Sequence, residues 1–149
     1  MKTYVIPRND GGVSILTADP KNILGVLEAW TAIQIEADNS AVANGGAPKN
    51  LRASGPVIEI DPAVIPTTRD FREAWMTQAG KIEHDMAKCK AIAHVKLKAK
   101  MAKELAPLVI EATTTAEAAR QVIRDKYAVL KVQVESATDL KTLRTVMRA

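Results

Sequence analysis

The sequence predicts an α+β fold in which an N-terminal β-hairpin and mixed α/β part precede a predominantly helical C-terminal half with a helical hairpin. Two β-prone runs flank a glycine turn near the N-terminus. Beyond Pro66, apolar residues recur mainly at three- and four-residue steps. We therefore expect two parts, residues 1–66 and 67–149, in a chain of 149 residues that is long enough to bury a core.

The β-hairpin is predicted from two runs, residues 3–6 and 13–16, that are rich in Val, Ile, Thr and Tyr. Asn9-Asp10-Gly11-Gly12 lies between them and supplies the residue types that a tight turn needs. Further along, residues 57–60 form a short apolar strand candidate that Asp61-Pro62 ends. The N-terminal part is therefore expected to contain both strands and a helix.

The first helix is expected to begin at Asp19-Pro20, an N-cap followed by proline at the first helical position. Its apolar residues at roughly helical spacing are Ile23, Leu24, Leu27, Trp30, Ile33 and Ile35. We expect this helix to bury one face, with Trp30 as its largest side chain. Residues 39–55 are rich in Asn, Gly, Ala, Ser and Pro, and they predict a flexible loop or linker.

The C-terminal part begins with Thr67-Thr68, which can cap a short helical segment over residues 69–76. Asp85 can cap a long helix that ends near Ala106, before Pro107. The apolar residues of this long helix form two stripes, Ile92, Val95, Ala99 and Ala102 on one side and Ala93, Leu97, Met101 and Leu105 on another. Both stripes can pack within one domain, or one of them can form a subunit interface.

Another helix is expected after a cap within residues 113–115. Its seam of apolar residues consists of Ala116, Ala119, Ile123, Tyr127, Leu130, Val134 and Ala137. This seam fits a short coiled coil, and it fits antiparallel pairing with the preceding helix equally well. A final short helix is expected from Asp139 onward.

The composition is that of a folded globular protein, with 47% apolar and 26% charged residues and a net charge of +4. One cysteine excludes a disulfide framework, and no apolar run predicts a secretory signal or a membrane span. We expect synthesis in a reducing cytoplasm. The basic residues Lys88, Lys90, Lys96, Lys98, Lys100 and Lys103 surround one helix with no aromatic residue between them, so nucleic acid is not an expected partner.

The residue types of a zinc site occur together in Glu83, His84, Asp85, Cys89 and His94. On one helix, His84, Cys89 and His94 point about 140° apart, so they cannot meet on one ion. Neither histidine lies at a spacing that would place a base beside Cys89, and the glycine pairs lack a phosphate-loop ending. The sequence therefore predicts no catalytic, cofactor-binding or metal-binding residue, and we do not expect an enzyme.

Residues that can bind a partner protein are predicted at two places. The first contains Phe71 and Trp75, four residues apart, with Arg69 and Arg72 beside them. The alternative for this aromatic pair is a local hydrophobic plug within its own domain. The second place lies on the long helix, where we select Leu97 and Met101.

Three separated segments carry motifs in a common order. The central one consists of Ile65-Pro66, Arg69, Phe71-Arg72, Ala74-Trp75, Asp85-Met86, Lys88 and Ile92. The outer two are Asp10-Gly11-Gly12-Val13-Ser14-Ile15 and Ser136-Ala137-Thr138 with Leu140-Lys141-Thr142-Leu143. Together they resemble small proteins encoded among the structural genes of tailed bacteriophages. Thr68 departs from the pattern, since those proteins tend to carry an aspartate before the arginine.

The resemblance implies a non-catalytic virion or virion-assembly protein in the head, neck or tail. We expect other phage virion proteins as partners, a homo-oligomer with several symmetric copies, and no cofactor. One alternative is an assembly chaperone or adaptor that is absent from the mature particle. Another is a basic accessory protein that binds nucleic acid without sequence preference.

Overall fold

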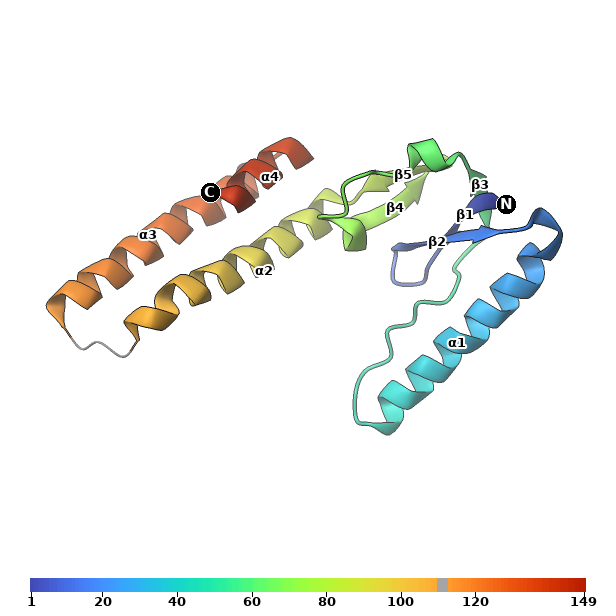
Figure 1. The fold of residues 1–149 in the computed structure, drawn as a ribbon, viewed down its shortest axis with the longest axis horizontal. Helices are drawn as coiled ribbons and strands as arrows, with labels where there is room; N and C mark the ends of the chain where they lie inside the picture. Colours follow the sequence, from blue (N-terminus) through green and yellow to red (C-terminus); the bar gives the residue numbers. More distant parts are fainter. Residues whose placement is uncertain (110–112) are drawn as a thin grey trace. The chain divides into compact units, whose positions relative to one another are not determined.

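The computed structural model describes residues 1–109 and 113–149, and it has the α+β fold that the sequence predicts. Its contacts divide the chain into two compact units, which we call unit 1 (Met1–His84) and unit 2 (Asp85–Ala149). Among these residues, the strands and one long helix lie in unit 1, and unit 2 is helical (Figure 1).

Unit 1 is built on a three-stranded antiparallel sheet. Its strands are β1 (Lys2–Pro7), β2 (Val13–Ala18) and β3 (Ile58–Ile60), in the order β2-β1-β3. The predicted hairpin is confirmed, with Lys2 paired to Ala18 and Pro7 paired to Val13. Gly11, with a φ of 73°, provides the left-handed residue of the turn.

A second hairpin replaces the helical segment predicted at residues 69–76. After a 3₁₀ turn at Arg72–Ala74, strands β4 (Trp75–Gln78) and β5 (Lys81–His84) pair antiparallel. Ala79 and Gly80 form the two-residue turn with φ values of 49° and 75°. Positive φ at both positions matches the twist of a two-residue hairpin, so Gly80 reverses the chain here rather than ending a helix.

The core of unit 1 joins residues from both hairpins. It contains Val5, Val13, Ile60, Trp75 and Ile82, with Ile15, Ile58 and Ile65 packed against it. Because the second hairpin contributes to this core, the division of the chain falls after His84, and the predicted boundary at residue 66 lies inside unit 1. The break at Pro66 is a turn within a unit rather than a linker between units.

Helix α1 (Ile23–Ala43) follows a 3₁₀ turn at Pro20–Asn22, whose N-cap is Asp19, as expected. The helix is longer than predicted, because residues 39–43, assigned to the loop, continue it. It ends in a Schellman motif, in which the amides of Gly45 and Gly46 donate to the carbonyls of Val42 and Ala41. The alanines of the last turns favour helix until Gly45 takes a φ of 74°.

The segment after α1 returns along the helix to the sheet. Asp38 on α1 accepts hydrogen bonds at Oδ1 from the amides of Lys49 and Asn50, at 2.8 and 3.1 Å. Further on, the amide of Asn9 donates to the carbonyl of Arg52, and the amide of Ser54 donates to the carbonyl of Pro7. The segment is therefore attached by backbone hydrogen bonds to both α1 and the β1–β2 hairpin.

The apolar side chains of α1 are largely exposed, which contradicts the expected buried face. Among the described side chains of the helix, Asp38 alone is buried, and Trp30 is only half-buried. Leu24 is 72% exposed and Ile33 is 60% exposed. Apolar spacing predicted the helix correctly, but within unit 1 the helix has too few neighbours to cover it.

The described residues of unit 2 form three α-helices, which Figure 1 shows. They are α2 (Met86–Leu105), α3 (Thr114–Ser136) and α4 (Leu140–Arg148), with a 3₁₀ turn at Ala106–Leu108 after α2. The predicted caps are confirmed at Asp85 and, within residues 113–115, at Thr113, whose side chains accept a bond from a first-turn amide. Asp139, where the last helix was expected to start, caps α4 in the same way. Helices α2 and α3 lie antiparallel along each other, and α4 packs on both.

The seam predicted on α3 faces the other helices of unit 2. Its buried members are Ala116, Tyr127, Leu130, Val134 and Ala137. Antiparallel pairing with α2 therefore accounts for it within the chain. On α2, Ala93 and Leu97 of one stripe are buried, whereas Val95 of the other stripe is 70% exposed. Thus only one of the two stripes packs within the unit.

None of the helices within residues 1–109 and 113–149 combines the length and the apolar content that a membrane span requires.

Candidate functional site

The aromatic pair proposed as a partner anchor is inside the protein. Phe71 is fully buried and Trp75 is 2% exposed, so neither ring is available to a partner in this structure. Trp75 belongs to the unit 1 core, which corresponds to the alternative of a hydrophobic plug. Arg69 and Arg72 are exposed, and they remain candidates for contact with a partner.

His84 has a structural role beside Trp75. The two residues are directly paired across β4 and β5, and their rings are perpendicular, with centroids 6.3 Å apart. The indole Nε1–H of Trp75 donates to Nε2 of His84 at 3.0 Å. Because Nε2 accepts this bond, the imidazole proton of the neutral ring lies on Nδ1. This pair satisfies the polar group of a buried tryptophan.

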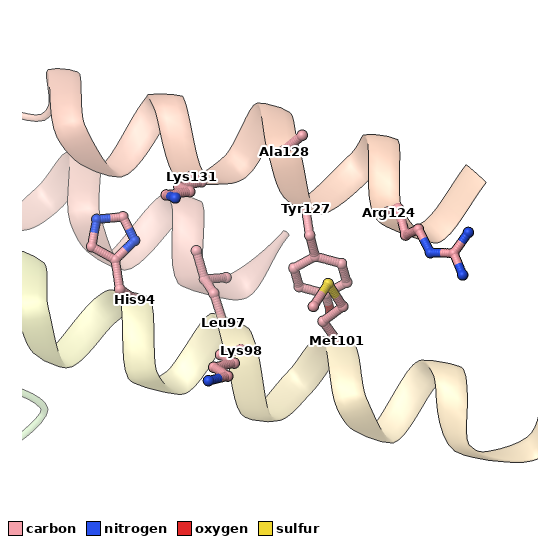
Figure 2. A pocket seen from close by; sticks show the side chains of 8 residues that line it. All are labelled: His94, Leu97, Lys98, Met101, Arg124, Tyr127, Ala128 and Lys131. Atoms are coloured by element: carbon pink, nitrogen blue, oxygen red, sulfur yellow. The ribbon is translucent and has the colours of Figure 1, made fainter. Parts of the chain in front are cut away.

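The other predicted partner residues, Leu97 and Met101, lie at a groove between α2 and α3. The groove has a volume of about 400 Å³ and is lined by His94, Leu97, Lys98, Met101, Arg124, Tyr127, Ala128 and Lys131. Leu97 extends from α2 toward α3, and Tyr127 extends from α3 toward α2 (Figure 2). Both of these side chains are about 95% buried, so they form an ordered apolar floor.

Polar contacts hold Tyr127 in place at this floor. Its hydroxyl donates to Oε1 of Glu104 at 2.7 Å, and Nζ of Lys126 lies 3.1 Å from the same oxygen. Burial, followed by the bond to Glu104, raises the pKa of Tyr127 to about 12. The bonds from Tyr127 and Lys126 lower the pKa of Glu104. Tyr127 is therefore a neutral, fixed hydrogen-bond donor, and its ring provides apolar surface.

One end of the groove is closed by a contact between the helices. Nε2 of His94 lies 2.6 Å from Oε1 of Glu135, and Nζ of Lys90 donates to the Glu135 carbonyl at 2.6 Å. These bonds join α2 to the C-terminal turns of α3. They fix the spacing of the two helices, and with it the width of the groove.

The rim of the groove is basic. Lys98, Arg124 and Lys131 line it together with His94, and the lining contains no acidic side chain. Arg124 is paired with Glu117 at 2.9 Å, whereas for Lys98 and Lys131 the described part of the chain shows no acidic partner. Unit 2 as a whole carries 13 basic and 7 acidic residues, so its formal charge is +6. Such a groove suits an apolar ligand with acidic flanks.

Unit 1 has the opposite balance, with 8 basic and 10 acidic residues and a formal charge of −2. Helix α1 contains three acidic residues, Glu28, Glu36 and Asp38, and no basic one. Leu24, Ile35, Glu28 and Glu36 are exposed on the helix, whereas Asp38 is buried. The helix is thus an apolar and acidic surface that the rest of unit 1 leaves uncovered.

The residues considered for a zinc site are engaged in other ways. Asp85 caps α2 by accepting from the amides of Ala87 and Lys88, and His94 contacts Glu135. Cys89 is fully buried, and this burial raises the pKa of its thiol to about 11. Over residues 1–109 and 113–149 the structure contains no cluster of three His, Cys, Asp or Glu that could hold a metal ion.

Sequence reasoning missed both the basic groove and the exposure of α1. The two lysines of the rim, Lys98 and Lys131, are far apart in sequence, and only the antiparallel pairing of α2 and α3 brings them to one groove. For α1 a signal was present, because apolar residues occur on every side of the helix. A helix of this composition is typical of one that is covered all round.

Comparison of the chain with protein-family models, curated proteins and solved structures gives no match.

Proposed function

We propose that this protein is a non-catalytic structural component of a tailed-phage virion, located in the head, neck or tail, that binds other virion proteins in several symmetric copies. The observation that carries the proposal is α1, a 21-residue helix with exposed apolar side chains on opposite sides. Leu24 and Ile33 are too exposed for a helix that functions alone in water. They suit a chain that is completed by assembly.

The resemblance to phage structural-gene proteins supports the same proposal through its central motif. Phe71, Ala74 and Trp75 are buried, and Asp85 caps α2. The motif residues therefore form the end of unit 1 and the start of unit 2. A pattern with this role is expected to accompany a common fold, while exposed surfaces such as α1 differ according to partner.

Mass spectrometry of virions of the phage that encodes this chain tests the proposal. Particles purified through two successive density gradients are expected to contain the protein at a fixed ratio to the major capsid protein. As a control, a phage carrying a stop codon early in the gene should yield particles without it and with reduced infectivity. Absence from wild-type particles, with normal infectivity of the mutant, would contradict a virion role.

An assembly chaperone or adaptor is the second candidate, and the exposed apolar surface of α1 also favours it. A chaperone binds its client during morphogenesis and leaves before maturation. It is expected to be abundant in infected-cell lysates and depleted from purified particles, while the mutant phage fails to assemble. The same two phage stocks therefore separate a structural component from a chaperone.

A nucleic-acid-binding accessory protein is a third candidate, favoured by the +6 charge of unit 2. Binding to phosphates through lysines weakens steeply with added salt. Retention of the protein on double-stranded DNA at 50 mM salt, lost at 200 mM salt, would support this candidate. No retention at low salt would exclude it.

A further inference from the structure

Helix α1 carries a largely exposed stripe in its first three turns. Along this stripe, residues follow one another at steps of four, three and four: Leu24, Glu28, Thr31 and Ile35. Leu24 and Ile35 are 72% and 40% exposed, and Glu28 is exposed between them; the next position on this face, Asp38, is buried under the segment that contains Lys49 and Asn50. A second acidic residue, Glu36, lies beside the stripe. The stripe is therefore apolar with negative charges.

The α2–α3 groove has the complementary character. Its floor is formed by Leu97, Met101 and Tyr127, and its rim carries Lys98 and Lys131, one from each helix. The lining residues extend over about two turns of each helix, or roughly 11 Å. Grooves between helices commonly receive one face of an amphipathic helix through contacts at steps of three and four residues. A two-turn window of the α1 stripe has the length that this groove accepts.

We propose that α1 of one copy of this chain docks a two-turn window of its Leu24–Ile35 stripe into the basic α2–α3 groove of a second copy. Charge complementarity selects this occupant, because α1 has two exposed acidic residues, Glu28 and Glu36, and no basic residue, whereas the groove lining has no acidic residue. Pairing of α1 with α1 of another copy would bring like charges together. In the docked arrangement Glu28 and Glu36 lie near Lys98 and Lys131.

This contact is heterologous, since it joins two different surfaces of the chain. Each copy then offers one helix and one groove, so copies join head to tail into a ring if the rotation closes, or into a filament if it does not. The inference gives a physical basis for the several copies in the proposed function. It rests on that function only for its place in a virion.

The first test is sedimentation of the purified full-length chain over a range of concentrations. The wild-type chain is expected to associate beyond a dimer. The charge reversals Glu28→Lys with Glu36→Lys on α1, or Lys98→Glu with Lys131→Glu at the groove, should each weaken association at least about tenfold, because like charges then meet. Glu83→Lys on β5 and Lys103→Glu on α2 are matched controls at exposed positions outside both surfaces, and they should leave association unchanged.

Mixing the two double variants gives a sharper result. The unchanged groove of the α1 variant matches the unchanged α1 of the groove variant, and the two reversed surfaces also carry opposite charges, so an equimolar mixture should regain association beyond a dimer. Leu24→Ser with Ile35→Ser should remove association without changing the helical circular dichroism, since both side chains are exposed. A mixture that stays monomeric, or association that survives the groove variant by itself, would overturn the proposal.

A wild-type chain that stays monomeric at every concentration would also overturn it, including the case in which α1 occupies the groove of its own chain. The outcomes are separable from those of the virion test. A chain that associates head to tail but is absent from particles contradicts the virion role alone. A monomer that is abundant in particles contradicts this contact alone.

Discussion

Helices α1 and α3 are similar in length, with 21 and 23 residues, but they differ in how the chain covers them. The more apolar helix, α1, buries only Asp38 among its described side chains, whereas α3 buries Ala116, Tyr127, Leu130 and Val134. Helix α3 packs these residues against α2 and α4, although Val122, Val129 and Val132 on its other sides are exposed. The comparison teaches that burial depends on having a neighbour, and that a high apolar content does not by itself bury a helix.

The largest expected effect is a loss of stability when the unit 1 core loses Trp75, and a tryptophan on α1 provides the comparison. Trp75→Ala should lower the free energy of unfolding by at least about 3 kcal/mol, because it removes a large side chain from a closed core. Trp30→Ala on α1 is the matched variant, and it should cost much less since Trp30 is half-buried. Urea unfolding followed by far-ultraviolet circular dichroism measures both. Equal losses would show that α1 is as well covered as the core.

The next largest loss of stability is expected at a buried leucine of α3, compared with an exposed leucine of α1. Leu130→Ala on α3 should destabilise unit 2 by about 2–3 kcal/mol, since Leu130 is only 5% exposed. Leu24→Ala on α1 should change stability by less than about 0.5 kcal/mol, because an exposed leucine loses little and alanine favours helix. Thermal unfolding at low protein concentration, where copies are separate, is the measurement. A large loss at Leu24 under these conditions would reveal a neighbour within the chain.

A smaller loss of stability is expected when either of the two histidines is replaced by alanine. His84→Ala should cost about 1–2 kcal/mol, because the buried indole N–H of Trp75 loses its acceptor. His94→Ala should cost less than about 1 kcal/mol, since its partner Glu135 is 62% exposed and water can replace the contact. Denaturant unfolding of both variants provides the comparison. The reverse order would mean that the α2–α3 contact matters more than the Trp75–His84 pair.

The smallest effect concerns alkaline pH in unit 2. The pKa of Tyr127 is raised from 10.0 to about 12, so its contribution to stability is present below pH 10 and is lost as the pH rises from about 10 to 12. In a Tyr4→Phe background Tyr127 is the remaining tyrosine. Its absorbance at 295 nm should then titrate near pH 12 in the folded protein and near pH 10 in urea. The same midpoint in both states would contradict a buried, hydrogen-bonded hydroxyl.

Much of the fold could be predicted because its signals are local. Asp85 and a residue within 113–115 were predicted as caps from residue type and position, and Asp85 and Thr113 each accept the expected backbone bond. The second hairpin could not be predicted in the same way. Its turn, Ala79-Gly80, lacks the usual Asn-Gly or Asp-Gly pair, and Ala79 takes a positive φ that alanine rarely adopts. The hydrogen bond between Trp75 and His84 stabilises this hairpin, whose turn residues do not strongly favour it.

The candidate site was only partly predictable for a different reason. Leu97 and Met101 were selected from helical spacing, and both line the groove. The aromatic pair was harder to interpret, since Phe71 and Trp75 fit a core and an interface equally well, and one sequence does not distinguish them. Burial depends on neighbours such as Ile60 and Ile82, which are distant in sequence or on another strand.

Asp38 has a consequence for how the chain is handled by proteases. Its carboxylate holds the amides of Lys49 and Asn50, and the neighbouring Arg52 is bonded through its carbonyl to Asn9. A segment with a lysine and an arginine on an exposed loop is an obvious substrate for trypsin, but cleavage requires the backbone to leave its hydrogen bonds and extend. The loop should therefore resist digestion while Asp38 is present, and Asp38→Ala would turn it into a cutting site that severs α1 from β3.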